Sequence, residues 1–189
     1  MKQRRFLILL LMVLAISAKP QKVTIDNGHF YSVYDVGIQC PMQVGWTVTP
    51  SDLGGASREP SWIFIQDVSH PLATGNHYDF SRTGYDRGHM CPAQDRSRDL
   101  LAMRSTFVMS NIAPQAPALN RGAWKKTEVF CRKAALLYDT VQVLALPVFL
   151  NRDTTFIGGH RLAVPHAFIK AAWLPKNDSI IGLWWFWNR

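Results

Sequence analysis

The segment from Tyr85 to Ala93 reads Tyr-Asp-Arg-Gly-His-Met-Cys-Pro-Ala, so an acid, a guanidinium, a glycine and an imidazole follow one another at positions 86–89. Because glycine lacks a Cβ, Gly88 can adopt conformations that other residues resist and can aim the next side chain out of a strand end or turn. Pro92 cannot donate a ladder hydrogen bond, so no central strand should continue past it. We predict a turn here that presents His89 as a general base.

The same residues also fit an ordinary turn, in which Asp86 pairs with Arg87 or a nearby donor and His89 lies on the surface. Two later segments favour the functional interpretation. Residues 106–115 read Thr-Phe-Val-Met-Ser-Asn-Ile-Ala-Pro-Gln, and residues 120–128 read Asn-Arg-Gly-Ala-Trp-Lys-Lys-Thr-Glu. The second segment has the form Asn-x-x-x-Trp-x-x-x-Glu.

These three motifs, in this order, resemble those of the DNA/RNA non-specific endonucleases of the ββα-metal superfamily, over roughly residues 30–172. The resemblance implies an α+β fold with an antiparallel-rich central sheet, in which a hairpin bearing the histidine packs on one main catalytic helix. It implies a phosphodiester hydrolase that uses Mg²⁺, with Mn²⁺ as an alternative, on DNA and RNA, and leaves 5′-phosphate ends. Family members are often dimers, so a homodimer is an expected partner state.

The resemblance also implies site roles. His89 matches the general base, Asn120 the direct protein ligand of the metal, and Glu128 the acceptor for the ion's waters. Asn111 matches a site asparagine of the family, and Arg87 matches an arginine that holds the phosphate. Arg58 matches an arginine that stabilises the transition state, and Arg82 is the alternative candidate for that role.

Elementary chemistry agrees with these roles. Phosphodiester hydrolysis needs a base, a cation and help for the leaving oxygen. Mg²⁺ keeps most of its waters, so one amide oxygen, that of Asn120, is a sufficient anchor. On a regular helix, Glu128 would lie about 80° around the axis from Asn120, with Trp124 between them. The plainer alternatives are that Asn120 is a helix N-cap and Glu128 a solvated helix residue.

Composition limits the class of protein. A chain of 189 residues suits one domain, and 48% hydrophobic with 18% charged residues excludes a disordered chain. The formal net charge is +8, to which Lys2, Arg4 and Arg5 contribute three. A positive balance suits a polyanionic partner such as nucleic acid.

The first 18 residues resemble a secretory signal peptide. A basic start precedes an apolar run from Phe6 to Ile16, and Ser17 and Ala18 offer small residues for cleavage. We therefore expect a signal peptide at 1–18, a single domain at 19–189, a secreted or periplasmic location, and no stable membrane association after cleavage. An uncleaved N-terminal anchor is the alternative.

The three cysteines allow two states. Cys91 and Cys131 could form a disulfide in an oxidising compartment, whereas buried free thiols fit equally well. A zinc site that combined them with His89 is disfavoured, because the His-x-Cys spacing is tighter than the usual gap of about two to four residues.

The remaining pattern predicts one long helix among many strands. The expected helix is 119–138, and the expected strands are 30–36, 42–48, 62–65, 106–110, 141–150, 166–174 and 179–187, after a polar lead-in at 19–28 and with a loop at 69–84. The last strand contains five consecutive large apolar residues, from Leu183 to Trp187. They suggest an exposed apolar patch, a partner surface or a truncated C-terminus. A truncated, catalytically impaired nucleic-acid- or partner-binding domain is therefore the alternative function.

Overall fold

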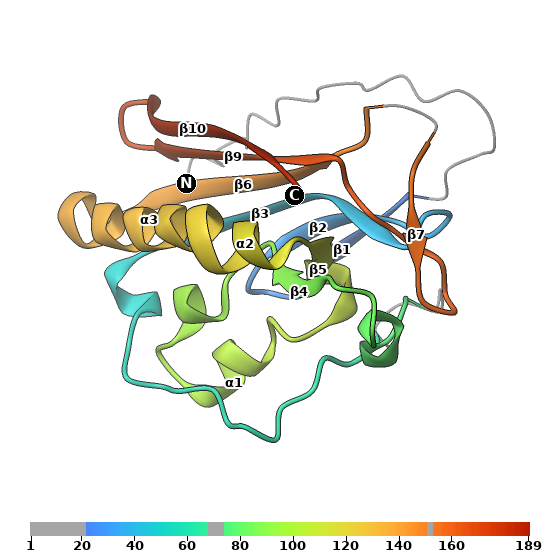
Figure 1. Ribbon diagram of the computed structural model, residues 1–189. Coiled ribbons are helices and arrows are strands. Elements are labelled where there is room, and N and C mark those ends of the chain that lie inside the picture. The colour runs from blue at the N-terminus through green and yellow to red at the C-terminus, as the bar shows by residue number, and fades with distance from the viewer. Residues whose placement is uncertain (1–21, 68–73, 151–152) are drawn as a thin grey trace.

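The computed structural model describes residues 22–67, 74–150 and 153–189, and its central feature is a six-stranded sheet in the order β1-β2-β3-β6-β9-β10 (Figure 1). The strands are β1 (Lys22–Asp26), β2 (Tyr31–Asp35), β3 (Cys40–Val48), β6 (Val141–Val148), β9 (Ala167–Leu174) and β10 (Ser179–Trp187). Every neighbouring pair is antiparallel. This confirms the predicted α+β class with its antiparallel sheet. The predicted signal peptide lies outside the described residues.

Two short strand pairs stand apart from this sheet. They are β4 (Asp86–His89) with β5 (Ile112–Gln115), and β7 (Phe156–Ile157) with β8 (Leu162–Ala163). The helices are α1 (Leu100–Arg104), α2 (Pro117–Leu119) and α3 (Lys125–Tyr138). Single helical turns are η1 (Pro50–Asp52), η2 (His77–Phe80), η3 (Ala93–Arg96), η4 (Met109–Asn111) and η5 (Asn120–Trp124). In the described part of the chain, no helix is long and apolar enough to cross a membrane.

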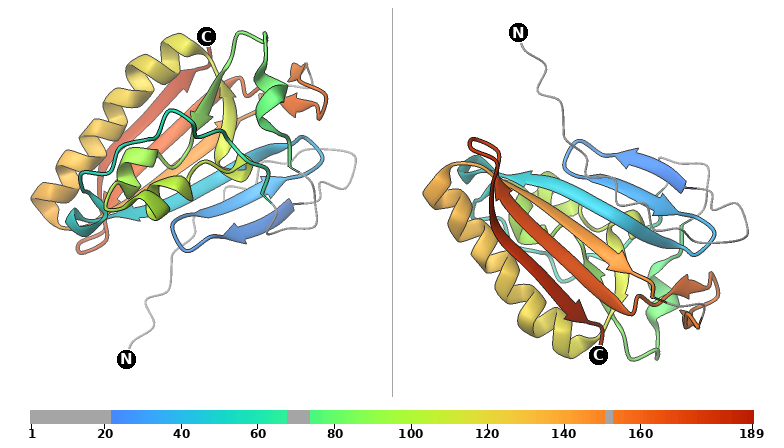
Figure 2. Two further views of the ribbon diagram at one scale, coloured as in Figure 1. Left: turned by 90° about the horizontal axis from the view of Figure 1, so that it is seen from below. Right: turned by 90° about the horizontal axis from the view of Figure 1, so that it is seen from above.

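The elements form layers on one side of the sheet. Figure 2 shows α3 and α1 on the same face, while no helix of the described residues covers the opposite face. One apolar cluster, which includes Trp124, Val143 and Phe168, fills the space between sheet and α3. A second apolar cluster lies on the other side of β5. Ile112 packs into this second cluster, whereas the next residue, Ala113, packs into the first. The β4–β5 pair is therefore buried between two cores, which fixes its position.

The long helix differs from its prediction. It is interrupted by the π-type turn η5, where Gly122 takes non-helical angles of φ −105° and ψ −106°. The extra residue in this turn shifts the helical phase, so Ala123 is exposed and Trp124 takes the buried place. Tyr138, at the other end of the expected helix, is 52% exposed. The angle of about 80° between Asn120 and Glu128 assumed an unbroken helix and does not apply.

The C-terminal strand is less exposed than its composition suggests. Alternate residues of a strand face opposite sides, and Trp184 and Phe186 pack toward α3 while Leu183, Trp185 and Trp187 are exposed. The rings of Phe130 and Trp184 lie 5.4 Å apart, in an edge-to-face arrangement. The predicted apolar patch therefore exists, but it comprises only one face of β10.

Other segment predictions were wrong. Part of the polar lead-in forms strand β1, because its residues from Lys22 to Asp26 pair with β2. Residues 62–65 make only an isolated bridge, in which Ile65 pairs with Val108. The strand expected at 106–110 is a loop ending in η4, and the extended segment follows it as β5. Short segments such as these are decided by the packing around them rather than by their own propensity.

All three cysteines are buried and free. Burial raises the pKa of each thiol, including those of Cys91 and Cys131. The free-thiol alternative is therefore confirmed over the disulfide.

Candidate active site

The strand β4 carries the histidine. His89 pairs with Ile112 across β4 and β5, and the strand ends there, before Pro92, as predicted. Gly88 does not serve as a conformational hinge, because it is not among the glycines with positive φ. It is needed for space instead: a Cβ at this position would lie 2.4 Å from Oε1 and 2.7 Å from Cβ of Gln115. The glycine therefore allows the side chain of Gln115 to pack against the strand.

His89 lies between two phenylalanine rings. Its ring centroid is 5.1 Å from that of Phe64 and 4.8 Å from that of Phe107. Its Nε2 is enclosed and has no hydrogen-bond partner among the described residues, whereas the side chain as a whole is half-buried. Burial, assisted by the nearby charge of Arg58, lowers the pKa of His89 to about 3. The imidazole is therefore neutral, with Nδ1 as the nitrogen that can meet water.

The two predicted arginines lie beside this histidine. Arg58 places its guanidinium carbon 4.9 Å from the ring centre of Phe107 and 5.8 Å from that of Phe64, the rings that flank His89. Arg87 donates from Nη2 and Nε to the carbonyl oxygen of His77, at 2.7 and 3.2 Å. The structure therefore brings Arg58 to the histidine, and no contact of the described residues does the same for its rival Arg82.

Asn120 is bound to the other end of β4. Its Nδ2 donates to Oδ2 of Asp86 at 2.9 Å. Arg121 donates to the same carboxylate from Nε and Nη2, at 2.8 and 2.6 Å. These contacts, with that of Arg121 foremost, hold the pKa of Asp86 below its usual range. Asn120 is thus held through its nitrogen, and among the described residues no donor occupies its Oδ1.

Trp124 links the same turn to the histidine. Its Nε1 donates to the backbone oxygen of His89 at 3.1 Å, and its ring is fully buried. Asn120 and Trp124 thus bind opposite ends of β4, so η5 runs alongside the strand. Asp86 and His89 stand three positions apart on β4, so their side chains point to opposite faces of the strand.

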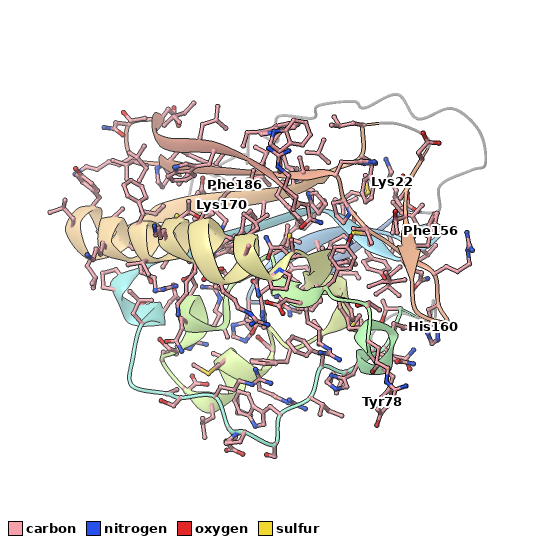
Figure 3. The ribbon with its side chains drawn as sticks, in the orientation of Figure 1. Lys22, Tyr78, Phe156, His160, Lys170 and Phe186 are labelled. Atoms are coloured by element: carbon pink, nitrogen blue, oxygen red, sulfur yellow. The ribbon has the colours of Figure 1, made fainter. Side chains whose placement is uncertain are left out.

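Glu128 lies one turn further along, in the first turn of α3. Burial raises its pKa to about 7, and the charge of Lys170 opposes that shift. Lys170 on β9 is fully buried, and its Nζ lies 3.6 Å from the ring centre of Trp124 (Figure 3). This ammonium has no hydrogen-bond partner among the described residues, so the ring face of Trp124 and the charge of Glu128 are its compensation.

Asn111 is placed differently from a residue that meets substrate. It is fully buried, and its Oδ1 accepts from the backbone nitrogen of Cys91 at 2.8 Å. Its Nδ2 donates to the backbone oxygens of Cys91 and Thr106, at 2.9 and 3.0 Å. The side chain therefore fixes the loop that follows His89, and it has no surface with which to touch a ligand.

The donor set fits a hard divalent cation. Asp86 and Asn120, which are hydrogen-bonded to each other, supply carboxylate and amide oxygens, the ligand types that Mg²⁺ prefers. Residues 22–67, 74–150 and 153–189 contain no group of three or more His, Cys, Asp or Glu side chains placed to hold a metal. An ion held by Asn120 would therefore rest on few protein ligands.

A histidine-bearing strand pair, packed against a helix whose first turns carry an amide and a carboxylate, defines the ββα-metal class of nuclease fold. The solved structure of an EndoG/EndoGI complex supports this class, with a TM-score of 0.78 and 27% sequence identity over 88% of this chain and 74% of that chain. A family model described as DNA/RNA non-specific endonuclease matches residues 14–184. The chain belongs to this family.

Two curated relatives illustrate the similarity. Mitochondrial endonuclease G of Bos taurus is 33% identical over 168 residues, which are 84% of this chain and 56% of the relative. The mitochondrial nuclease of Saccharomyces cerevisiae is 36% identical over 130 residues, which are 67% of this chain and 40% of the relative. The chain thus spans about half the length of the curated relatives it matches.

These relatives correct one prediction. They are mitochondrial proteins by name, so the secreted or periplasmic location predicted from residues 1–18 is wrong. A basic, acid-free N-terminus is common to secretory signals and mitochondrial presequences, and this ambiguity misled the prediction.

Sequence reasoning missed several residues of the site. Arg121, which pairs with Asp86, follows Asn120 directly and was not singled out from the sequence. Lys170 was not singled out either, and its burial against Trp124 depends on a pairing between distant strands. The carbonyl of His77 that holds Arg87 lies in a segment expected to be a loop. Of these, only the adjacency of Arg121 and Asn120 offered a signal in the sequence.

Proposed function

We propose that this protein is a metal-dependent endonuclease that hydrolyses phosphodiester bonds of DNA and RNA. The observation that carries the proposal is the position of β4. One end of the strand holds the turn that contains Asn120, and the other presents His89 between rings that also support Arg58. The residues proposed as base and metal ligand thus lie on β4 or are bonded to it, which supports the proposal.

In the proposed reaction, Nδ1 of His89 takes a proton from the attacking water. A pKa of about 3 keeps this imidazole neutral, although it makes a weak base. A bound phosphate next to the ring would offset the charge of Arg58 and raise the pKa again. The 3′ oxygen leaves, so the product retains a 5′-phosphate.

The other side chains bind and orient. Arg87 and Arg58 hold the phosphate and stabilise the charge that develops on it. Asn120 would hold Mg²⁺, or Mn²⁺, through Oδ1, while Glu128 would accept hydrogen bonds from the ion's waters. When bound, the ion supplies positive charge for the phosphorane-like transition state and for the leaving oxygen. Asn111 and Trp124 are positioning residues, since they bind backbone around His89.

Plasmid nicking with added Mg²⁺, with and without EDTA, tests the proposal. We expect cleavage by the parent protein that EDTA abolishes, and at least a hundredfold loss in His89→Ala, in line with the usual contribution of a general base. His29→Ala, a change outside the site, is the matched control. A His89→Ala protein that cleaves as fast as the parent would eliminate the base assignment.

The metal ligand needs a separate readout. Calorimetric titration of Mg²⁺ and Mn²⁺ into His89→Ala measures binding without cleavage, and adding Asn120→Ala to this variant should abolish the signal. Parallel assays on double-stranded DNA, single-stranded DNA and RNA define the substrate range. If the parent binds nucleic acid but never cleaves it with either metal, the alternative of an impaired binding domain replaces the proposal.

A further inference from the structure

A second group of side chains lies at the edge of the molecule, outside the proposed catalytic residues. It combines η2 with the hairpin formed by β7 and β8, and we call it the rim patch. Its members are Tyr78, Phe156, His160 and Arg161. Figure 3 shows Tyr78, Phe156 and His160 along one edge of the molecule. Tyr78 is 74% exposed and Phe156 is 36% exposed. The rim patch therefore offers exposed aromatic rings and the guanidinium of Arg161 on neighbouring elements.

The rim patch is held rigidly by one buried carboxylate. Asp79 accepts from the backbone nitrogen of Asn76 at 2.7 Å, and from that of His160 at 3.1 Å. Its Oδ2 lies 2.9 Å from Nδ1 of His160. Gly158 fits only because it lacks a side chain, since a Cβ there would lie 2.3 Å from Cβ of Asp79. The hairpin is therefore fastened to η2, and the imidazole of His160 is oriented with Nε2 away from the carboxylate.

The cationic side chain of the rim patch is also positioned. The guanidinium carbon of Arg161 lies 4.6 Å from the ring centre of Phe156. Arg161 is exposed and has a φ of +57°, a conformation that a residue with a side chain rarely adopts. A glycine would make this turn at lower cost. The side chain is thus presented to solvent on a rigid support.

The rim patch is connected to the proposed catalytic site through η2. A row of rings runs outward from His89 through Phe64 and His77 to Tyr78, with successive centroid separations of 5.1, 6.3 and 5.5 Å. The same turn η2 supplies the carbonyl that holds Arg87. Phe64 in this row is buried, so the rings form a packed link rather than an exposed path, and Arg87 and Tyr78 are supported by the same turn.

We infer that the rim patch is a subsite for an unpaired stretch of nucleic acid that flanks the bond to be cleaved. A base stacks on Tyr78, and the adjoining phosphate lies against Arg161 and His160. Base-on-aromatic stacking with a basic neighbour is how single strands are bound without sequence preference. A duplex would hide its base faces, so its affinity should owe nothing to Tyr78. This inference rests on the proposed function, because it assigns the subsite to the same substrate.

Binding is measured by fluorescence anisotropy in a His89→Ala background with EDTA, so that cleavage cannot interfere. The probes are a labelled single strand of about 12 nucleotides, within the usual site sizes for such binding, and the matching duplex. Tyr78→Ala should weaken single-strand binding about tenfold and leave duplex binding unchanged, while Tyr78→Phe retains affinity. Arg161→Ala should weaken binding to both probes. The slope of log affinity against log salt concentration should fall by the amount expected for about one phosphate contact.

Tyr138→Ala is the matched control, because Tyr138 is an exposed tyrosine at the end of α3 farthest from the hairpin (Figure 1). Equal single-strand affinity for Tyr78→Ala and Tyr138→Ala would overturn the inference, as would an equal loss on the duplex. The proposed function fails in a different way, namely when the parent cleaves no nucleic acid with either metal. A parent that cleaves, together with a Tyr78→Ala variant that binds normally, would overturn the subsite alone.

Discussion

Replacing Asn111 by alanine should destabilise the protein strongly. The side chain makes three buried hydrogen bonds of 2.8, 2.9 and 3.0 Å to the backbone of Cys91 and Thr106. Each bond contributes about 1 kcal/mol net, and the truncation also leaves buried backbone groups unpaired. The expected loss is about 3 to 5 kcal/mol in the free energy of unfolding. For a chain of this size that corresponds to roughly 6 to 20 °C in Tm.

Urea and thermal unfolding, followed by circular dichroism, measure this loss. Asn177→Ala is the control, because this asparagine is exposed and accepts only a long bond of 3.3 Å from Ser179. Asn177→Ala should change the free energy of unfolding by no more than about 0.5 kcal/mol. Asn111→Asp keeps the acceptor for Cys91 but loses both donated bonds and buries a carboxylate against two carbonyl oxygens, so it should be at least as unstable as Asn111→Ala.

The refuting result is specific. If Asn111→Ala keeps its Tm within a degree or so of the parent while cleavage is lost, the side chain acts on substrate rather than on the loop. The account of Asn111 as a positioning residue would then be wrong.

Three further predictions concern buried or half-buried charges. Asp86→Asn should be less stable than the parent at neutral pH, and the gap should close as pH falls below about 4. The stability that the lowered pKa of Asp86 contributes is complete above the unfolded pKa and is lost as pH falls through the folded pKa. Glu128 has a raised pKa of about 7, so in EDTA the parent should lose stability as pH rises from about 4.5 to 7, and Glu128→Gln should lack this slope in urea titrations. Lys170→Met should move the acid limb of the rate profile to higher pH, because the ammonium counteracts the raised pKa of Glu128. A rate profile identical to that of the parent would show that Lys170 and Glu128 do not interact.

The sequence predicts the central strands well because their patterns are local. The segments around β3, β6, β9 and β10 alternate or run apolar for eight or nine residues, and the hairpin turn between β9 and β10 lies where its Pro-Lys-Asn-Asp sequence indicates. Pro147 lies within β6, although proline has no backbone N–H to donate. The pairing of β6 with β3 ends at Ala145, so no hydrogen bond to β3 is lost at Pro147.

The sequence predicts individual residues of the candidate site, but it does not predict the hydrogen bonds and packing that join them. Asn120 and His89 stand out by residue type and spacing, whereas the π-type turn between Asn120 and Trp124 has no clear signature beyond Gly122. The bond from Trp124 to the His89 carbonyl involves backbone, which no side-chain pattern encodes. The burial of Lys170 arises from packing between β9 and α3, which depends on the whole fold.

The three enclosed thiols give the molecule built-in reporters of its own opening. A thiol-reactive dye can label a buried cysteine only when the segment around it transiently separates from its neighbours. Cys40 reports on the sheet, Cys91 on the loop after the histidine, and Cys131 on the middle of α3. The order in which they are modified would rank these three regions by the ease with which each comes apart.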